Sequence, residues 1–161
     1  MIVPFESLPQ ESRIWIYPSN RPFQEEELVL IKDALSHFLS EWTAHDQALE
    51  AAFKIPYNRF IVLGLNQEKT QASGCSIDKS VRFIQQLEQQ FEIVLLDKMN
   101  VTFKQGDFFS HKSLEDFKKM AKEKAITKST VVFNNLVDTV EACDNFWEVP
   151  AEESWHSRFF K

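Results

Sequence analysis

Hydrophobic and polar positions along the chain follow two periods, one typical of strands and one typical of helices. Residues 12–17 (SRIWIY) alternate as in a strand and end at a turn-forming Pro-Ser-Asn. Residues 23–43 carry apolar side chains at helical spacing, after Pro22 and with three glutamates in the first turn, which suit a helix N-terminus. The first 43 residues therefore predict a strand followed by a long helix.

The next segment predicts a β-hairpin and a second helix. Residues 49–55 and 59–65 are strand-like and flank Pro56-Tyr57-Asn58, so they should pair antiparallel. A polar loop over 66–74 then leads into a second amphipathic helix. Its apolar stripe repeats every three or four residues and consists of Ile77, Val81, Ile84, Leu87 and Phe91.

The rest of the chain is less regular. Residues 91–97 suit either a strand or a helix end, and 101–103 predict a strand. Ser113-Leu114-Glu115-Asp116 matches the helix-start pattern [ST]-x-x-[DE] and predicts a third helix to about Glu123. Residues 129–133 predict another strand, and a short final helix is expected to begin near Pro150.

The order strand, helix, strand, strand, helix, strand is typical of a split βαβ sandwich. We therefore predict an α+β fold of the ferredoxin-like kind, an antiparallel sheet with helices packed on one face, extended by a C-terminal helix and strand. No repeat and no Pro/Gly/Ser-rich linker interrupts the sequence. A single α/β domain over residues 1–161 is the expectation.

Composition and charge exclude some partners. The chain has 161 residues, 43% of them hydrophobic, and a formal net charge of −6. It therefore lacks the general positive field that non-specific nucleic-acid binding requires, and no nucleic-acid partner is expected. One basic cluster is interpreted as a solvated helix face and consists of Lys112, Lys118, Lys119, Lys122 and Lys124.

The sequence shows neither a targeting leader nor a metal-binding pattern. No segment approaches the roughly 20 apolar residues that cross a membrane, so no membrane insertion and a cytoplasmic location are expected. Cys75 and Cys143 are the only cysteines, without C-x-x-C or metal-like Cys/His spacing. Free thiols, no metal site and no cofactor are therefore predicted, and the oligomeric state stays open.

Several common catalytic signatures are absent. The only glycines, Gly64, Gly74 and Gly106, are too far apart for a P-loop or a dinucleotide fingerprint. The patterns G-x-S-x-G and H-E-x-x-H are missing as well. ATP hydrolysis of the P-loop kind is therefore excluded.

The strongest candidate site is ASGCSIDKS, residues 72–80, at the predicted start of the second helix. Gly74 favours a turn, Ser76 is expected to cap the helix, and the open amides with the positive dipole end favour an anion. Candidate walls are Trp15, Tyr17 and Trp42. The predicted ligand-binding residues are Gly74, Ser76, Asp78, Lys79 and Arg82, with Asn134 and Asn135 as either turn residues or further ligand contacts.

Two other hypotheses remain open. Cys75 lies beside a helix start, where a thiol can be activated, so it is a candidate catalytic nucleophile with one of His37, His45, His111 and His156 as base. An aromatic C-terminal surface containing Trp147, Trp155 and Phe159 is a candidate protein-interaction site. The structural alternatives are that Cys75 is a buried plug, and that the tail closes the core.

Several segments together resemble a family of small bacterial proteins often labelled "ABC transporter ATPase". They are ESRIWIYPSNRPF, EWTAHDQALEAAF, NRFIVLGLN, ASGCSIDKSVRFIQQLE, VVFNNLVDT and VPAEESWHSRFF, and they span nearly the whole chain. A transporter ATPase requires a Walker A loop and an LSGGQ-type signature, which this sequence lacks. The resemblance therefore implies family membership and, through the family label, an association with a transporter. It supplies no catalytic residues. The leading prediction is a module that binds a small anionic ligand or a protein partner without ATPase activity.

Overall fold

The computed structural model describes residues 1–161, and its contacts gather into two compact units. The first unit consists of Met1–Leu96 and Asp138–Glu141, and the second of Asp97–Val137 and Ala142–Lys161. Both combine helices with antiparallel sheets, so the mixed α/β class is confirmed. The expectation of a single domain over residues 1–161 stays a prediction.

The first unit is built on a three-stranded antiparallel sheet of order β1-β5-β4. The strands are β1 (Arg13–Pro18), β4 (Glu50–Lys54) and β5 (Phe60–Asn66). Leu63 of the central strand lies opposite Trp15 on one side and Phe53 on the other. The first strand and the hairpin are therefore confirmed, and the hairpin turns through a short 3-10 segment, η2 (Pro56–Asn58).

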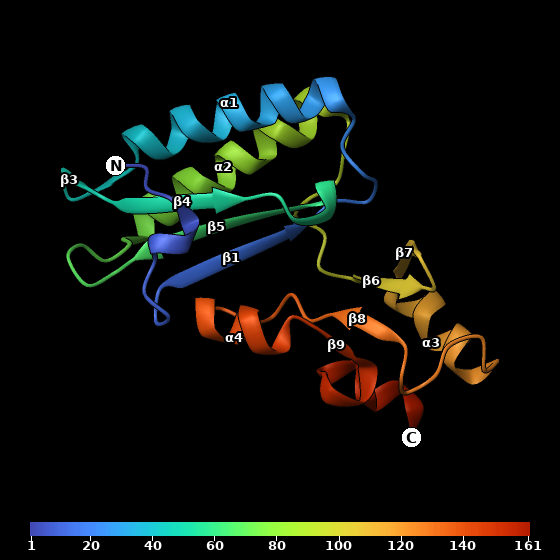
Figure 1. The fold of residues 1–161 in the computed structure, drawn as a ribbon. Coiled ribbons are helices and arrows are strands. Elements are labelled where there is room, and N and C mark those ends of the chain that lie inside the picture. Colours follow the sequence, from blue (N-terminus) through green and yellow to red (C-terminus); the bar gives the residue numbers. More distant parts are fainter. The chain divides into compact units, whose positions relative to one another are not determined.

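Both long helices of this unit lie on the same face of the sheet (Figure 1). They are α1 (Glu25–Glu41) and α2 (Gly74–Phe91), close to the predicted bounds. Their apolar stripes bury against the strands in one core. This core includes Ile31, Leu35, Leu39, Ile84 and Leu87 from the helices and Ile61, Leu63 and Leu65 from β5.

Short segments pair with both edges of this sheet, which otherwise would expose unpaired backbone groups. At the β4 edge, Ile2 forms a parallel bridge with Ala51. At the β1 edge, Arg13 forms an antiparallel bridge with Thr139, and Ile14 N donates to Asp138 O over 2.9 Å. A two-stranded ribbon of β2 (Thr43–Ala44) and β3 (Gln47–Ala48) follows α1, and η1 (Phe5–Ser7) precedes β1.

The central strand leaves no room for a side chain at Gly64. A Cβ at this position would lie 2.5 Å from Cδ1 of Leu8 and 3.1 Å from Cε2 of Phe5. Leu8 is buried and cannot simply swing into solvent. Gly64→Ala is therefore expected to lower the free energy of unfolding by about 1–3 kcal/mol, measured by urea denaturation.

Gly74→Ala is the matched control for that substitution. Nothing lies within 4 Å of a Cβ at Gly74, which is the first residue of α2. Because alanine restricts the unfolded chain and favours helix, this variant should be unchanged or up to about 1 kcal/mol more stable. Equal destabilisation of both variants would show that packing against Leu8 is not the cause.

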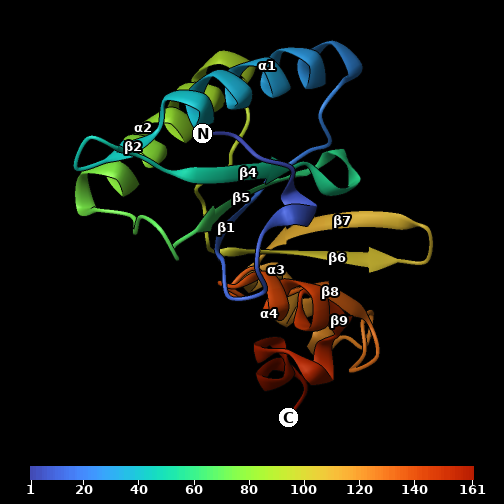
Figure 2. The same cartoon turned by 60° about the vertical axis from the view of Figure 1, so that its left-hand side comes forward.

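The second unit contains a four-stranded antiparallel sheet of order β7-β6-β8-β9. The strands are β6 (Asn100–Gln105), β7 (Phe108–Ser113), β8 (Val131–Phe133) and β9 (Glu148–Pro150), and Figure 2 shows β6 and β7 as a long hairpin. The strands predicted at 101–103 and 129–133 are confirmed. Residues 91–97 form neither a strand nor a full helical turn beyond Phe91.

Helices of the second unit are short. The predicted third helix is α3 (Leu114–Lys122), capped by Ser113, whose Oγ accepts from Asp116 N over 3.0 Å. The predicted final helix is two 3-10 segments instead, η3 (Ala151–Glu153) and η4 (Trp155–Phe160). α4 (Val140–Phe146) was not predicted, and its first two residues belong to the first unit. The core of this unit contains Val101, Phe103, Phe117, Ile126, Val132 and Ala151.

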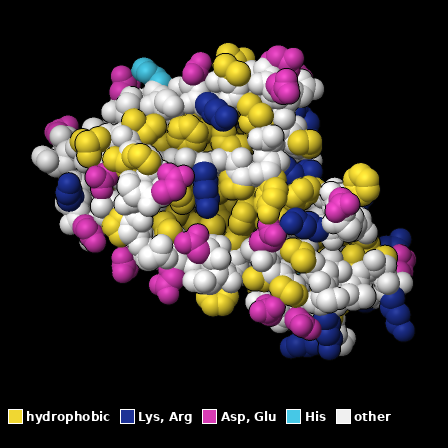
Figure 3. Space-filling view, in the orientation of Figure 1, with side chains coloured by type: hydrophobic (Ala, Val, Ile, Leu, Met, Phe, Trp, Pro, Cys, Tyr) yellow, Lys and Arg dark blue, Asp and Glu magenta, His cyan; other side chains and the backbone are white.

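The surface of the chain carries both apolar and charged side chains. On the face shown in Figure 3, hydrophobic side chains gather over the strands of the first unit, with basic and acidic side chains interspersed around them. The five lysines of the predicted solvated cluster are all exposed. None of the helices has the length and apolar content needed to span a bilayer.

Candidate functional site

The predicted site at the start of α2 is present, but its helix cap is a different serine. Ser73 is the N-cap, and its Oγ accepts from Ser76 N over 3.1 Å. Ser76 Oγ accepts in turn from Ser73 N over 2.7 Å, which completes a reciprocal capping box. The prediction that Ser76 caps the helix is correct only in part, because Ser73 is the N-cap and Ser76, at the third helical position, accepts from the Ser73 amide.

Ser76 is also inaccessible, with 1% of its surface exposed. Its carbonyl oxygen accepts a hydrogen bond of 2.9 Å from the indole Nε1 of Trp42, which follows the last residue of α1. This bond ties the end of α1 to the start of α2. Ser76 therefore joins two helices and does not take part in a ligand cradle.

Three predicted site residues do lie open at this helix start. Gly74, Cys75 and Asp78 are exposed. The Cys75 thiol is free and exposed, and no hydrogen bond joins it to a histidine. The Asp78 carboxylate opposes an anion at the same place. The helix start alone therefore supplies neither a catalytic pair nor an unopposed positive site.

A cleft of about 360 Å³ lies between α1 and α2. α1 and its C-terminal neighbours supply Ala34, His37, Phe38, Glu41, Trp42 and Thr43, and α2 supplies Lys79, Phe83 and Gln86. The rings of Phe38, Trp42 and Phe83 supply an apolar wall, and five of the nine lining residues are polar or charged. The helical spacing of Phe38 and Trp42 alone does not distinguish a core from the wall of a cleft.

Aromatic rings form a continuous array along this cleft. Phe38 and Phe83 stack with ring centroids 4.5 Å apart and planes 7° from parallel. Phe38 also contacts Trp42 at 5.6 Å, and Trp42 contacts Trp15 at 6.0 Å in an edge-on arrangement. Trp42 thus lines the cleft, Trp15 supports it from β1, and Tyr17 belongs to the buried core.

Lys79 is the only basic residue of the cleft apart from a histidine that already has an acidic partner. The Lys79 side chain is exposed and makes no hydrogen bond or ion pair. His37 Nε2 lies 3.4 Å from a carboxylate oxygen of Glu41. Arg82, predicted to act with Lys79, is exposed on α2 but does not line the cleft. The cleft therefore offers one unpartnered ammonium group beside aromatic rings.

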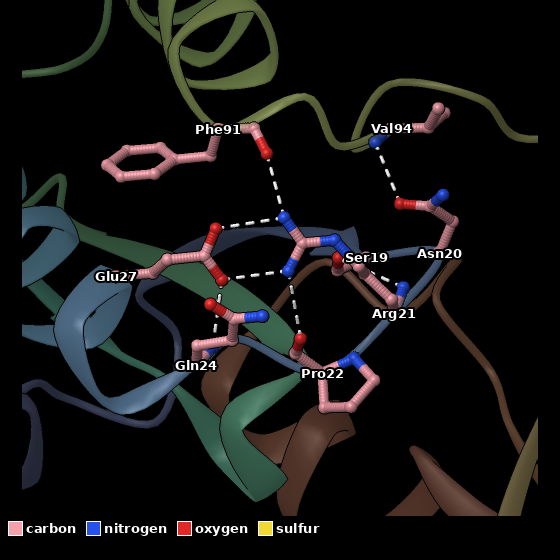
Figure 4. A network of polar contacts seen from close by, with 8 residues as sticks. All are labelled: Ser19, Asn20, Arg21, Pro22, Gln24, Glu27, Phe91 and Val94. Atoms are coloured by element: carbon pink, nitrogen blue, oxygen red, sulfur yellow. Dashed lines mark hydrogen bonds and ion pairs between the residues drawn. The ribbon is translucent and has the colours of Figure 1, made fainter.

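The two helices that form the cleft are also tied at their other ends (Figure 4). Arg21 makes two parallel hydrogen bonds of 2.8 Å with the Glu27 carboxylate and a third of 2.7 Å with the carbonyl oxygen of Phe91. Glu27 belongs to α1 and Phe91 ends α2. Hydrogen bonding from Arg21 lowers the pKa of the Glu27 carboxyl to about 2.

Arg21→Ala is expected to lower the free energy of unfolding by about 1–3 kcal/mol, because it removes a bidentate ion pair and leaves the Phe91 carbonyl without this donor. Since the Glu27 pKa is lowered, the contribution is present above about pH 4.5 and is lost as pH falls toward 2. Urea denaturation at pH 7 and pH 3 measures both effects. Arg21→Lys keeps the charge without the bidentate geometry and should recover only part of the loss. Full recovery by lysine would contradict the role of geometry.

The predicted asparagines lie in the second unit and make local hydrogen bonds. Asn134 Oδ1 accepts from Leu136 N over 3.2 Å, as in an Asx turn. Asn135 Oδ1 accepts from the indole Nε1 of Trp147 over 2.8 Å. Trp147 itself is 7% exposed and packs on Phe133 with ring centroids 4.8 Å apart. These contacts assign structural roles to both asparagines and to Trp147.

The aromatic tail packs on its own unit. Trp155 stacks on His156 with centroids 3.8 Å apart, and Phe159 meets Phe117 edge-on at 5.7 Å. His156 is buried, its Nδ1 lies 2.7 Å from Ser154 Oγ, and burial together with the charge of Arg158 lowers its pKa to about 4. The sequence did not predict the contact between Ser154 and His156, because the spacing Ser-x-His does not by itself indicate a hydrogen bond.

A second cavity, of about 410 Å³, lies within the second unit. It is lined by the end of β6 and the 125–131 segment, including Lys104, Gly106 and Ser129. Lys104 Nζ already pairs with Glu148 at 3.0 Å. This cavity therefore lacks the unpartnered charge and the ring array that distinguish the α1–α2 cleft.

Comparisons with known proteins leave the function to be inferred from the structure. The chain matched no protein-family model, no curated protein and no solved structure. His, Cys, Asp and Glu side chains do not gather in any group of three or more that could hold a metal ion. The α1–α2 cleft is therefore the feature on which a function can be based.

Proposed function

We propose that the first unit binds a small anionic ligand in the α1–α2 cleft and does not hydrolyse ATP. The observation that carries this proposal is the unpartnered ammonium group of Lys79 beside the half-buried Phe38–Phe83 ring pair. The apolar wall would bury the body of a ligand, and Lys79 would hold its negative group. The cleft volume lies within the usual range for small-molecule sites, about 300–1,000 Å³.

The cleft is supported by contacts at both ends of its helices. Trp42 bonds to Ser76 where α1 ends and α2 begins. Arg21 joins Glu27 of α1 to Phe91 at the end of α2. A site whose walls are held in place before binding loses less entropy when a ligand enters. The contacts at both ends of the helices therefore favour binding of a ligand in the cleft.

The same unit supports the ferredoxin-like proposal for the fold. Its order β1-β5-β4, with all pairs antiparallel and both helices on one face, is what three strands of a split βαβ sandwich would give. The fourth strand of that fold would pair antiparallel with β1. The bridge from Arg13 to Thr139 lies at that edge and has that direction.

A thiol-dependent reaction at Cys75 is a second candidate. It is favoured by the exposure of the thiol on the first turn of α2, one helical turn before Lys79. The likeness to the family labelled "ABC transporter ATPase", and the cytoplasmic location, also stay proposals. An interaction surface on the C-terminal tail has less support, because Trp147 is buried.

Lys79→Gln is expected to weaken binding of hexanoate about two- to fivefold without changing binding of 1-hexanol. The two probes have similar apolar chains, and only hexanoate carries the charge that Lys79 would meet. The size of the effect is that of an exposed ion pair. Amide chemical-shift titration of the labelled protein measures both affinities and shows whether the shifts fall on Phe38, Thr43 and Phe83.

Arg82→Gln is the matched control, because it removes an equal charge from the same helix outside the cleft. It should leave the preference for hexanoate over 1-hexanol intact. Equal losses for Lys79→Gln and Arg82→Gln would indicate a diffuse charge effect. Shifts confined to residues outside the cleft would contradict the proposed function.

A further inference from the structure

We infer that the cleft selects an aromatic anion, a ligand that joins a flat ring to a single carboxylate or comparable acidic group. This inference rests on the proposed function, since it concerns the ligand class of the same cleft. It adds that the apolar part of the ligand is a ring rather than an alkyl chain. The support comes from the ring array, from the spacing of Lys79 and Phe83, and from the charges at the rim.

The array of aromatic rings along the cleft can accommodate the ring of a ligand. Trp15, Trp42, Phe38 and Phe83 contact one another in sequence, and the last two stack nearly parallel. Phe38 and Phe83 are only half-buried and line the cleft, so part of each ring faces its interior. Ring pairs gain energy beyond the area they bury when they stack or meet edge-on. A ligand ring would extend the array, whereas an alkyl chain would gain only burial.

The spacing along α2 places Lys79 beside Phe83 on the helix surface. Lys79 and Phe83 are four residues apart on one helix face, so their Cβ atoms are about 5–6 Å apart. A carboxylate that meets Lys79 while its ring contacts Phe83 would therefore be separated from that ring by a short linker. Two methylene groups, as in 3-phenylpropionate, provide such a linker.

The charges at the rim disfavour the opposite kind of ligand. Aromatic rings with a nearby carboxylate can also hold an ammonium ion. Here the carboxylate is Glu41, which already lies 3.4 Å from His37. Lys79 has no ion-pair partner and would repel a cationic ligand, whereas the Glu41 carboxylate has His37 as a neighbour. An aromatic anion is thus favoured over an aromatic cation.

The experiment compares 3-phenylpropionate with 3-cyclohexylpropionate by amide chemical-shift titration. The two have the same charge, linker and ring size, so their affinity ratio reports the preference for an aromatic ring. We expect 3-phenylpropionate to bind about two- to tenfold more tightly. Phenethylammonium, which has the same ring with a positive charge, should bind more weakly than 3-phenylpropionate.

Two substitutions test whether Phe83 produces the preference for an aromatic ring. Phe83→Leu should bring the affinity ratio close to one while both carboxylates still bind and still depend on Lys79. Phe108→Leu is the control, because Phe108 is 78% exposed on the β6–β7 hairpin of the second unit, and it should leave the ratio unchanged. The ratio for the unaltered protein is informative even if Phe83→Leu does not fold.

The possible outcomes separate this inference from the proposed function. Equal binding of the two carboxylates in the cleft would overturn the aromatic preference and leave the anion site standing. Tighter binding of phenethylammonium would overturn both. Absence of binding by every probe would contradict the proposed function itself. Cleft shifts that depend on protein concentration alone would show that a second copy of the chain covers the cleft, and would also overturn the inference.

Discussion

Replacing Trp42 with alanine is expected to lower the free energy of unfolding by about 3–5 kcal/mol, measured by urea denaturation. Trp42 is 2% exposed, packs against both Phe38 and Trp15, and donates its indole hydrogen bond to Ser76. Alanine would leave a cavity in the first unit and remove the indole hydrogen bond to the Ser76 carbonyl. The loss should be accompanied by loss of ligand-induced shifts, because the cleft loses a wall.

Trp42→Phe separates the two contributions. Phenylalanine retains a ring against Phe38 but cannot donate a hydrogen bond to the Ser76 carbonyl. The expected loss is about 1–2 kcal/mol, from one lost hydrogen bond together with a modest change in packing. A loss below about 1 kcal/mol for Trp42→Ala would contradict the view that this residue holds the two helices together.

Lowering the pH from 7 to 4 is expected to destabilise the chain by roughly 2–3 kcal/mol through His156 alone. Burial holds the His156 pKa at about 4 in the folded chain, below its ordinary value of 6.5. The neutral imidazole is therefore favoured on folding. Its contribution is fully present above pH 6.5 and is lost as pH falls from 6.5 through 4.

His156→Phe isolates this effect from the carboxyl groups that titrate in the same range. Both proteins share those carboxyl groups, so the difference between their stability–pH curves reports His156. The variant should show a weaker dependence on pH between 7 and 4, measured by urea denaturation at several pH values. Parallel curves for His156→Phe and the unaltered chain would contradict burial of a neutral imidazole.

Hydrophobic periodicity predicted the first unit well because its elements are long and each buries one clear face. The stripe through Ile31, Leu35 and Leu39 identified α1, and the paired apolar runs around Pro56 identified the hairpin. β7 was missed because its sequence, FFSHKS, mixes polar residues and runs directly into the Ser113 cap of α3. Its pairing with β6, rather than local propensity, makes it a strand.

The candidate site was predicted only in part. The sequence identified Lys79 and Trp42, but it assigned the helix cap to Ser76 and paired Lys79 with Arg82. Whether a serine caps a helix depends on which of two neighbouring serines reaches the free amides, and this follows from the path of the loop. The Arg21–Glu27 pair was missed for a related reason, since its third partner is a backbone carbonyl 70 residues away.

Intermolecular nuclear Overhauser effects between the protein and 3-phenylpropionate test the central claim most directly. Binding in the α1–α2 cleft predicts contacts from the ligand ring to Phe83 and from the methylene next to the carboxylate to the Lys79 side chain. The cavity beside Gly106 and Ser129 should show no such contacts. Contacts confined to that second cavity, or a bound ligand with none to Lys79, would contradict an anion site in the cleft.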